Sequence, residues 1–149
     1  MLGGAEQGFL KYLLAPLIAW LLAQYLKYLL NRGAQRGQAW RLLYQSGNMP
    51  SAHTATLVAL TTMIGVYDGM ASGVFALATV VTAMAAYDAL MVRRSGGEQG
   101  LALRKLLEAS PFKKDPLPYQ ALGHRPLEVA VGALLGVTVG LCVAIFITI

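Results

Sequence analysis

The chain has 149 residues, of which 56% are hydrophobic and only 13% are charged. Because soluble domains usually carry about 25% charged residues, this composition excludes an ordinary water-soluble enzyme and indicates a membrane protein. A net charge of +5 is also typical of nucleic-acid-binding proteins. These proteins need a basic, solvated surface, which so apolar a chain does not offer, so no nucleic acid is expected as a partner. The length predicts a single membrane-embedded domain over residues 1–149.

Four apolar stretches are candidates for helices that cross the bilayer, which takes roughly 20 residues each. The first covers residues 8–30. The second covers residues 52–67 and is rich in threonine and alanine, which is typical of helices that pack against other helices. The third covers residues 70–92 and the fourth residues 126–149. We therefore predict an all-α integral membrane helical bundle of about four transmembrane helices, a multi-pass protein of the cell membrane.

The connections between these stretches differ in charge. Residues 31–50 carry three arginines and no acid, residues 68–70 form a tight turn without a basic residue, and residues 93–125 carry seven lysines and arginines. Since Lys and Arg mark cytoplasmic loops, the first and third connections are expected in the cytoplasm and both chain ends outside. Within the third connection, leucines at helical spacing over residues 98–109 predict a short amphipathic helix at the membrane interface.

Alternating spans bring four segments to one face of the bundle: the end of the first, the start of the second, the end of the third and the start of the fourth. The polar residues collected there are Lys27, Ser51, His53, Asp88, Arg93, Arg94, His124 and Glu128. Both histidines of the chain are among them, whereas the opposite face has Asp68 as its main charge. Such segregation of ionisable groups in a membrane protein indicates a functional site.

The second and fourth stretches both begin at this face, so their unpaired backbone N–H groups and positive dipole ends point to it. Together with Lys27, Arg93 and Arg94, the two helix N-termini favour an anion, most naturally phosphate. Of two histidines beside a phosphate, one can attack phosphorus through a neutral ring nitrogen, and the other can protonate the leaving oxygen. Glu128, four positions after His124, is placed to hold the tautomer of that ring.

Taken one at a time, these residues also have purely structural explanations. A serine ahead of a helix, such as Ser51, is commonly only an N-cap. An arginine pair after an apolar stretch is commonly a membrane-surface anchor, and Asp88 can serve as half of a structural ion pair with Lys27 or an arginine. The small-xxx-small pattern of Gly132 and Gly136 is typical of helix packing. The joint placement of the polar residues at one face is what favours a phosphate site.

Three segments carry a resemblance to a known family. They are Gly47-Asn48-Met49-Pro50-Ser51-Ala52-His53, then Tyr87-Asp88-Ala89 with Val92-Arg93-Arg94, and Gly123-His124-Arg125-Pro126-Leu127-Glu128-Val129. In this order, and with the apolar stretches between them, they resemble a divergent branch of the type 2 phosphatidic acid phosphatase superfamily, described as acid phosphatase/vanadium-dependent haloperoxidase-related. The resemblance implies hydrolysis of a lipid phosphate or diphosphate through a phosphohistidine intermediate, without a metal or other cofactor.

The resemblance also implies roles for individual residues. His124 matches the nucleophile, His53 the histidine that protonates the leaving group, and Glu128 the acid that orients the nucleophile. Ser51 would contact phosphate oxygens. The superfamily's usual lysine–arginine motif is not present in its usual form, and Pro118 stands where an arginine normally precedes the nucleophile. Lys27, Arg93 and Arg94 are therefore expected to supply the phosphate-binding charge.

A second interpretation belongs to a different functional class: a non-catalytic protein of the same fold that binds or transports anionic lipids. The missing lysine–arginine motif favours it. A small channel fits less well, because the polar residues gather at helix ends and not along a span. The expected partners are a membrane lipid phosphate and the bilayer itself, and the small size of the bundle suggests a homodimer.

Overall fold

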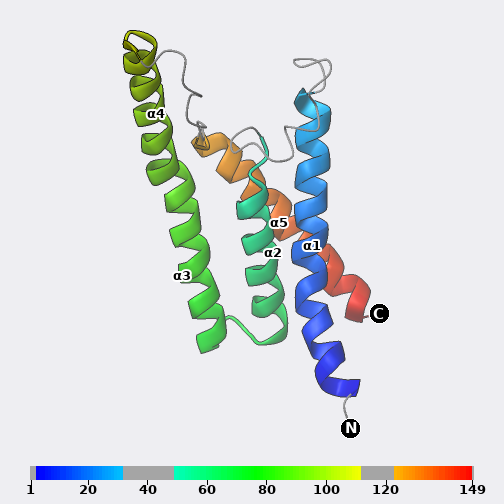
Figure 1. Ribbon diagram of the computed structural model, residues 1–149. Coiled ribbons are helices and arrows are strands. Elements are labelled where there is room, and N and C mark those ends of the chain that lie inside the picture. Colours follow the sequence, from blue (N-terminus) through cyan, green and yellow to red (C-terminus); the bar gives the residue numbers. More distant parts are fainter. Residues whose placement is uncertain (1–2, 32–48, 112–122, 149) are drawn as a thin grey trace.

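A computed structural model describes residues 3–31, 49–111 and 123–148, and the described part is built from helices (Figure 1). In chain order they are α1 (Gly3–Asn31), α2 (Ala52–Tyr67), α3 (Gly73–Tyr87), the π-helical segment η2 (Asp88–Val92), α4 (Arg93–Glu108) and α5 (Pro126–Thr148). The predicted helical membrane bundle is confirmed. The basic connection at residues 32–48 and the segment 112–122, which includes Pro118, lie outside the described residues.

Three described stretches are long and apolar enough to cross a membrane: Gly8–Leu30, Gly73–Glu108 and Pro126–Ile147. The α2 helix covers the predicted residues 52–67 but, with 16 residues, is shorter than a usual span. The third helix begins at Gly73, three residues later than predicted. The reason is local: the chain turns at Gly69, which has a φ of +85°, and the Ser72 side chain then caps α3 by accepting the Phe75 N–H at 3.1 Å.

The amphipathic helix predicted at residues 98–109 exists, but it begins at Arg93 and is not separate from the third span. In Figure 1 the α3 and α4 ribbons form one continuous rod. The π-helical turn η2 joins them while the backbone stays helical, with φ −67° and ψ −33° at Arg93. The polar segment therefore continues in the direction of α3.

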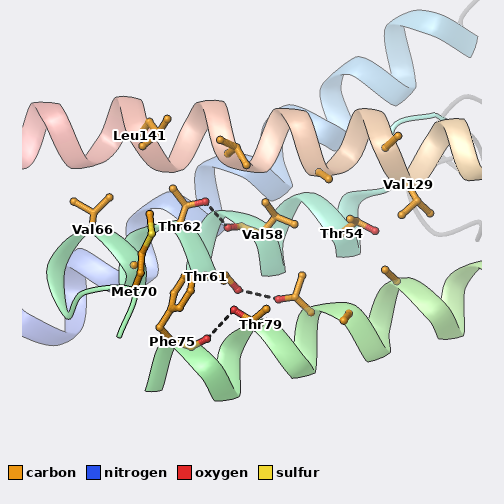
Figure 2. Close-up of a pocket in the computed structure, with 17 residues that line it drawn as sticks. Thr54, Val58, Thr61, Thr62, Val66, Met70, Phe75, Thr79, Val129 and Leu141 are labelled. Carbon is orange, nitrogen blue, oxygen red and sulfur yellow. Dashed lines mark hydrogen bonds between the residues drawn. The ribbon is translucent and has the colours of Figure 1, made fainter. Parts of the chain in front are cut away.

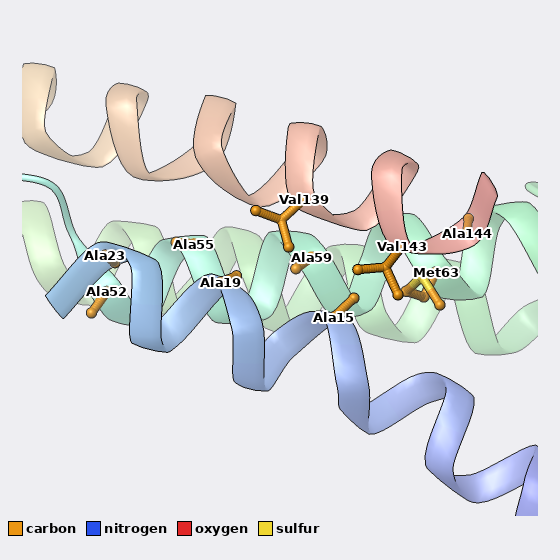
Figure 3. Packing of buried hydrophobic residues seen from close by; sticks show 10 residues of the cluster. All are labelled: Ala15, Ala19, Ala23, Ala52, Ala55, Ala59, Met63, Val139, Val143 and Ala144. Atoms are coloured by element: carbon orange, nitrogen blue, oxygen red, sulfur yellow. The ribbon is translucent and has the colours of Figure 1, made fainter. Parts of the chain in front are cut away.

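The centre of the bundle is built from small side chains (Figure 3). Buried alanines at four-residue spacing on α1 pack near buried alanines of α2, and α5 adds branched residues; the cluster contains Ala15, Ala19, Ala23, Ala52, Ala55, Ala59, Met63, Val139, Val143 and Ala144. Lipid tails are as apolar as these side chains, so helix association in a bilayer depends on close packing, which small residues permit. The alanine- and threonine-rich composition of α2 is explained by this packing.

Three glycines on α5 bring this helix into direct contact with α2. A Cβ atom added at Gly132 would lie 2.6 Å from the Ser51 carbonyl oxygen, and one at Gly136 would lie 2.5 Å from the Ala55 carbonyl oxygen. Gly140 continues the row against Thr62. The predicted role of the small-xxx-small pattern in helix packing is thus confirmed, and the contact places the start of α5 beside the start of α2.

Gly136→Ala is expected to lower the free energy of unfolding by about 1–3 kcal/mol, because the added methyl group meets helix backbone that cannot move alone. Gly96→Ala should raise stability by up to about 1 kcal/mol, since Gly96 lies within α4 with open space around it and alanine is the better helix former. Thermal unfolding of both variants in detergent measures the two shifts. Shifts of the same sign and size would contradict close α2–α5 packing.

At the opposite end of the bundle, a polar cluster forms around Asp68, the main charge of that face. Tyr12 Oη donates to Asp68 Oδ1 at 2.7 Å, and the Lys11 ammonium lies 4.3 Å from the centre of the Tyr67 ring. Tyr67 Oη in turn donates to the Ala144 carbonyl at 3.2 Å. These contacts join α1, α2 and α5, so Asp68 has a structural explanation.

Candidate functional site

Backbone hydrogen bonds tie together the segments that the sequence places at one face. The Ser51 N–H donates to the Glu128 carbonyl at 3.0 Å, which joins the start of α2 to the first turn of α5. The His124 N–H donates to the Ala89 carbonyl at 3.1 Å, which joins the segment before α5 to η2. Three of the four predicted segments therefore meet through the backbone, and α1 reaches the same end of the bundle with Lys27 (Figure 1).

The buried His124 and the partly buried Glu128 form a hydrogen-bonded pair at this end. The His124 side chain is 4% exposed, and its Nδ1 atom lies 2.9 Å from Glu128 Oε2. The same carboxylate oxygen accepts the Arg125 N–H at 3.2 Å. Among the described residues, the contact of Nδ1 with Glu128 is the only hydrogen bond of the His124 ring. A proton on Nδ1, donated to the carboxylate, leaves the lone pair on Nε2, the tautomer that a nucleophilic imidazole requires.

The position of His124 depends on the π-helical turn η2. Such turns are rare and occur frequently at functional sites, and here the Ala89 carbonyl within the turn accepts the His124 N–H. Next to it, Gly123 packs so closely against the backbone of Arg94 that no side chain fits there. The segment that carries His124 is therefore fixed on the junction between η2 and α4.

His53 lies in the first turn of α2, with its side chain exposed. Its ring interacts electrostatically with His124, Arg93 and Lys27, and with the Asp88 carboxylate. These charges come from α1, η2, α4 and the segment before α5. The two imidazoles thus lie at the same end of the bundle and within electrostatic range of each other.

The predicted basic residues are placed differently from one another. Lys27 is buried, at 4% exposure, and is attracted to the Glu128 carboxylate. Arg93 donates from Nε to Asp88 Oδ2 at 2.7 Å, with both side chains about 40% exposed. Arg94 instead donates to Glu98 at 3.3 Å, one turn along the exposed surface of α4. In this structure the Arg94 guanidinium is therefore paired along its own helix and not with the histidines.

Ser51 is completely buried and caps α2. Its hydroxyl lies 2.9 Å from the Thr54 hydroxyl and accepts the Thr54 N–H at 3.4 Å. Capping of this kind satisfies one of the otherwise unpaired N–H groups at a helix start. The Ser51 side chain thus has the structural role that a serine ahead of a helix commonly has.

Two residues that contribute to the site through their backbone, Ala89 and Gly123, lie in the segments of the family resemblance but are absent from the predicted site residues. Ala89 provides a carbonyl oxygen, for which its side chain carries no signal. Gly123 provides close approach to Arg94, and the only signal in the sequence is that glycine immediately precedes His124.

Comparison with known proteins shows which family this chain resembles. A family model described as "Divergent PAP2 family" matches residues 10–139. The chain is also 33% identical over 148 residues to the uncharacterized membrane protein YuiD of Bacillus subtilis (strain 168), and the alignment covers 90% of this chain and 94% of that protein. No solved structure matches the chain.

Proposed function

The chain belongs to the divergent PAP2 family and is a multi-pass membrane protein, and from this premise we propose that it is a phosphatase acting on a lipid phosphate or diphosphate. The observation that carries the proposal is the hydrogen-bonded pair of the buried His124 and Glu128, with the second histidine of the chain at the same end of the bundle. Together they supply a nucleophile, an orienting carboxylate and a general acid.

In the first step, the lone pair of His124 Nε2 attacks phosphorus and the bond from phosphorus to the lipid oxygen breaks. The protonated His53 ring gives its proton to that oxygen, so the lipid leaves as an alcohol, or as a monophosphate if the substrate is a diphosphate. His124 then carries the phosphoryl group on Nε2. Glu128 accepts the hydrogen bond from Nδ1–H and balances the positive charge that develops on the ring.

In the second step, water attacks the phosphohistidine. His53, now neutral, takes a proton from the water while the bond between phosphorus and His124 Nε2 breaks. Inorganic phosphate leaves, and both histidines return to their starting protonation states. This route uses a side-chain nitrogen as the nucleophile and needs no metal ion.

The charge on the phosphoryl oxygens would be balanced mainly by the surrounding positive groups. Lys27 and Arg93 both interact electrostatically with His53, and Lys27 also interacts with Glu128, so these two cations are the first candidates to bind the phosphate. The starts of α2 and α5 add backbone N–H groups and positive dipole ends. We propose Ser51 and Arg94 as further phosphate contacts, which requires each to exchange its present partner, Thr54 or Glu98, for the phosphate.

We propose that the protein resides in the cell membrane with this face toward the cytoplasm and both chain ends outside. The support is the number of basic residues in the two connections on this side. Basic residues recruited for phosphate binding contribute to the same count, so accessibility labelling of introduced cysteines in intact cells is the direct measurement.

A substrate panel tests the activity. The purified protein in detergent is expected to release phosphate from phosphatidate, phosphatidylglycerol phosphate or a polyprenyl diphosphate, and the release should continue in the presence of a metal chelator. Brief exposure to substrate labelled at the phosphorus, followed by rapid quenching, should trap a base-stable, acid-labile phosphohistidine. Strict dependence on Mg²⁺, or lipid binding without any covalent label, would contradict the proposal; the second outcome identifies a non-catalytic lipid-binding protein.

A further inference from the structure

An apolar groove begins directly beside the candidate site and runs along the bundle (Figure 2). It has a volume of about 620 Å³ and is lined by residues of α2, α3 and α5 together with Met70 of the turn. At one end lie Thr54, one turn after Ser51, and Val129, which follows Glu128 in the chain. At the other end lie Val66, Met70, Phe75 and Leu141.

The groove is apolar although five threonines line it, because every one of their hydroxyls is bonded within the protein. Thr61 bonds to the Leu57 carbonyl and to the Thr82 hydroxyl, each at 2.9 Å, and Thr62 donates to the Val58 carbonyl at 2.8 Å. Thr79 donates to the Phe75 carbonyl at 2.8 Å, and Thr54 is paired with Ser51. The threonines therefore contribute methyl groups to the groove, and a ligand needs no polar atoms to fill it.

We infer that this groove holds one hydrocarbon chain of the substrate lipid, with the phosphate at the His124 end. This inference rests on the proposed function for the phosphate and adds a defined place for the chain. From Thr54 to Val66, and equally from Val129 to Leu141, the groove follows twelve residues of helix, which is about 18 Å at 1.5 Å per residue. That length is close to half of the roughly 30 Å hydrocarbon thickness of a bilayer, the depth to which a single lipid chain extends.

The position of the groove indicates its occupant. Through Thr54 and Val129 one end of the groove adjoins Ser51 and Glu128, and the hydroxyls of the threonines along it are bonded within the protein. A molecule with a phosphate head and a hydrocarbon chain matches both parts, with the head at the candidate site and the chain in the groove.

The far end of the groove is lined by bulky side chains. The Phe75 ring packs against Gly65, where an added Cβ atom would lie only 2.9 Å from the ring, and Met70 lies beside it (Figure 2). Because lipid tails are as apolar as the groove, transfer of a chain from bilayer to groove gains little free energy. The main effect of the groove is to hold the phosphate in position for attack, and small displacements of a reacting group can reduce rates by roughly 10²-fold.

Photo-crosslinking locates the chain without requiring turnover. Hexadecyl phosphate with a diazirine at the end of its chain should label the segment from Val66 to Thr79 or the region of Leu141. The same label should appear in a variant that cannot hydrolyse the probe, so a failure of the proposed catalysis leaves this result interpretable. Labelling confined to the outer surface of α1, or spread evenly over all helices, would overturn the inference.

Blocking the groove tests its effect on the reaction. Ala83→Phe places a ring in the groove at an exposed position of α3, and kcat/KM for hexadecyl phosphate should fall roughly 10- to 100-fold while that for butyl phosphate is unchanged. Leu77→Phe, exposed on the opposite side of α3 and outside the groove, is the control and should change neither value. Equal losses for both substrates would overturn the inference, as would a change in oligomeric state caused by Ala83→Phe alone, which would indicate a protein partner in the groove.

Discussion

Replacing His124 with alanine is expected to reduce the hydrolysis of lipid phosphates to background, a loss of roughly 10⁴- to 10⁶-fold. The physical reason is that the proposed reaction has no other nucleophile: the bond to phosphorus forms at His124 Nε2, while Nδ1 is held by Glu128 at 2.9 Å. Without the ring, the neighbouring cations can bind phosphate but cannot accept it covalently. Two measurements check this prediction: phosphate release from the preferred lipid should fall to background, and no phosphorylated protein should be trapped.

Loss of folding must be separated from loss of chemistry, because the His124 side chain is almost completely buried. The contact that positions the segment is the backbone N–H of residue 124 on the Ala89 carbonyl, and alanine and asparagine both retain it. His124→Asn keeps a polar side chain of similar size and serves as the second variant. If either variant were folded, by thermal unfolding, and hydrolysed lipid phosphates at the wild-type rate, the assignment of the nucleophile would be wrong.

His53→Ala is expected to slow the hydrolysis of alkyl phosphates by roughly 10²- to 10⁴-fold, because an alkoxide is a poor leaving group without a proton donor. With p-nitrophenyl phosphate the leaving group needs no proton, so transfer to His124 should continue. Removal of the phosphoryl group from His124 should then be slow, since no base activates water. The product should therefore appear in a rapid burst, equal to the amount of protein, followed by a slow steady rate.

This pattern is specific to a general acid and base. His53 is exposed in the first turn of α2, where alanine is an excellent helix former, so the fold should be retained. The His124→Ala protein, which has no nucleophile, should give no burst and serves as the control. Equal losses for both leaving groups, without a burst, would show that His53 acts only on binding or folding.

The long apolar helices could be predicted from the sequence because the bilayer imposes a strong local rule. Backbone polar groups in lipid must be satisfied within the same segment, so a sufficiently long apolar stretch becomes a helix. The bounds of α2 and the start of α5 at Pro126 agree with the prediction for this reason. The order of the spans was also enough to bring Lys27, His53 and His124 to the same end of the bundle.

Other features depended on the tertiary structure. Whether Arg94 points to the histidines or along α4 is decided by the start of α4 at Arg93, because this helix places Glu98 one turn from Arg94. The Ala89 carbonyl that holds His124 has no counterpart in side-chain patterns. The groove exists because α2 lies between α3 and α5, and it is apolar because its threonines bond within α2 or to α3. Hydropathy and the order of the motifs are properties of the chain, and they determined which segments are helices and which residues lie at the candidate site. The side-chain partners of those residues and the groove depend on the distances between the helices, which are set by the glycines of α5 and the alanines of α1 and α2.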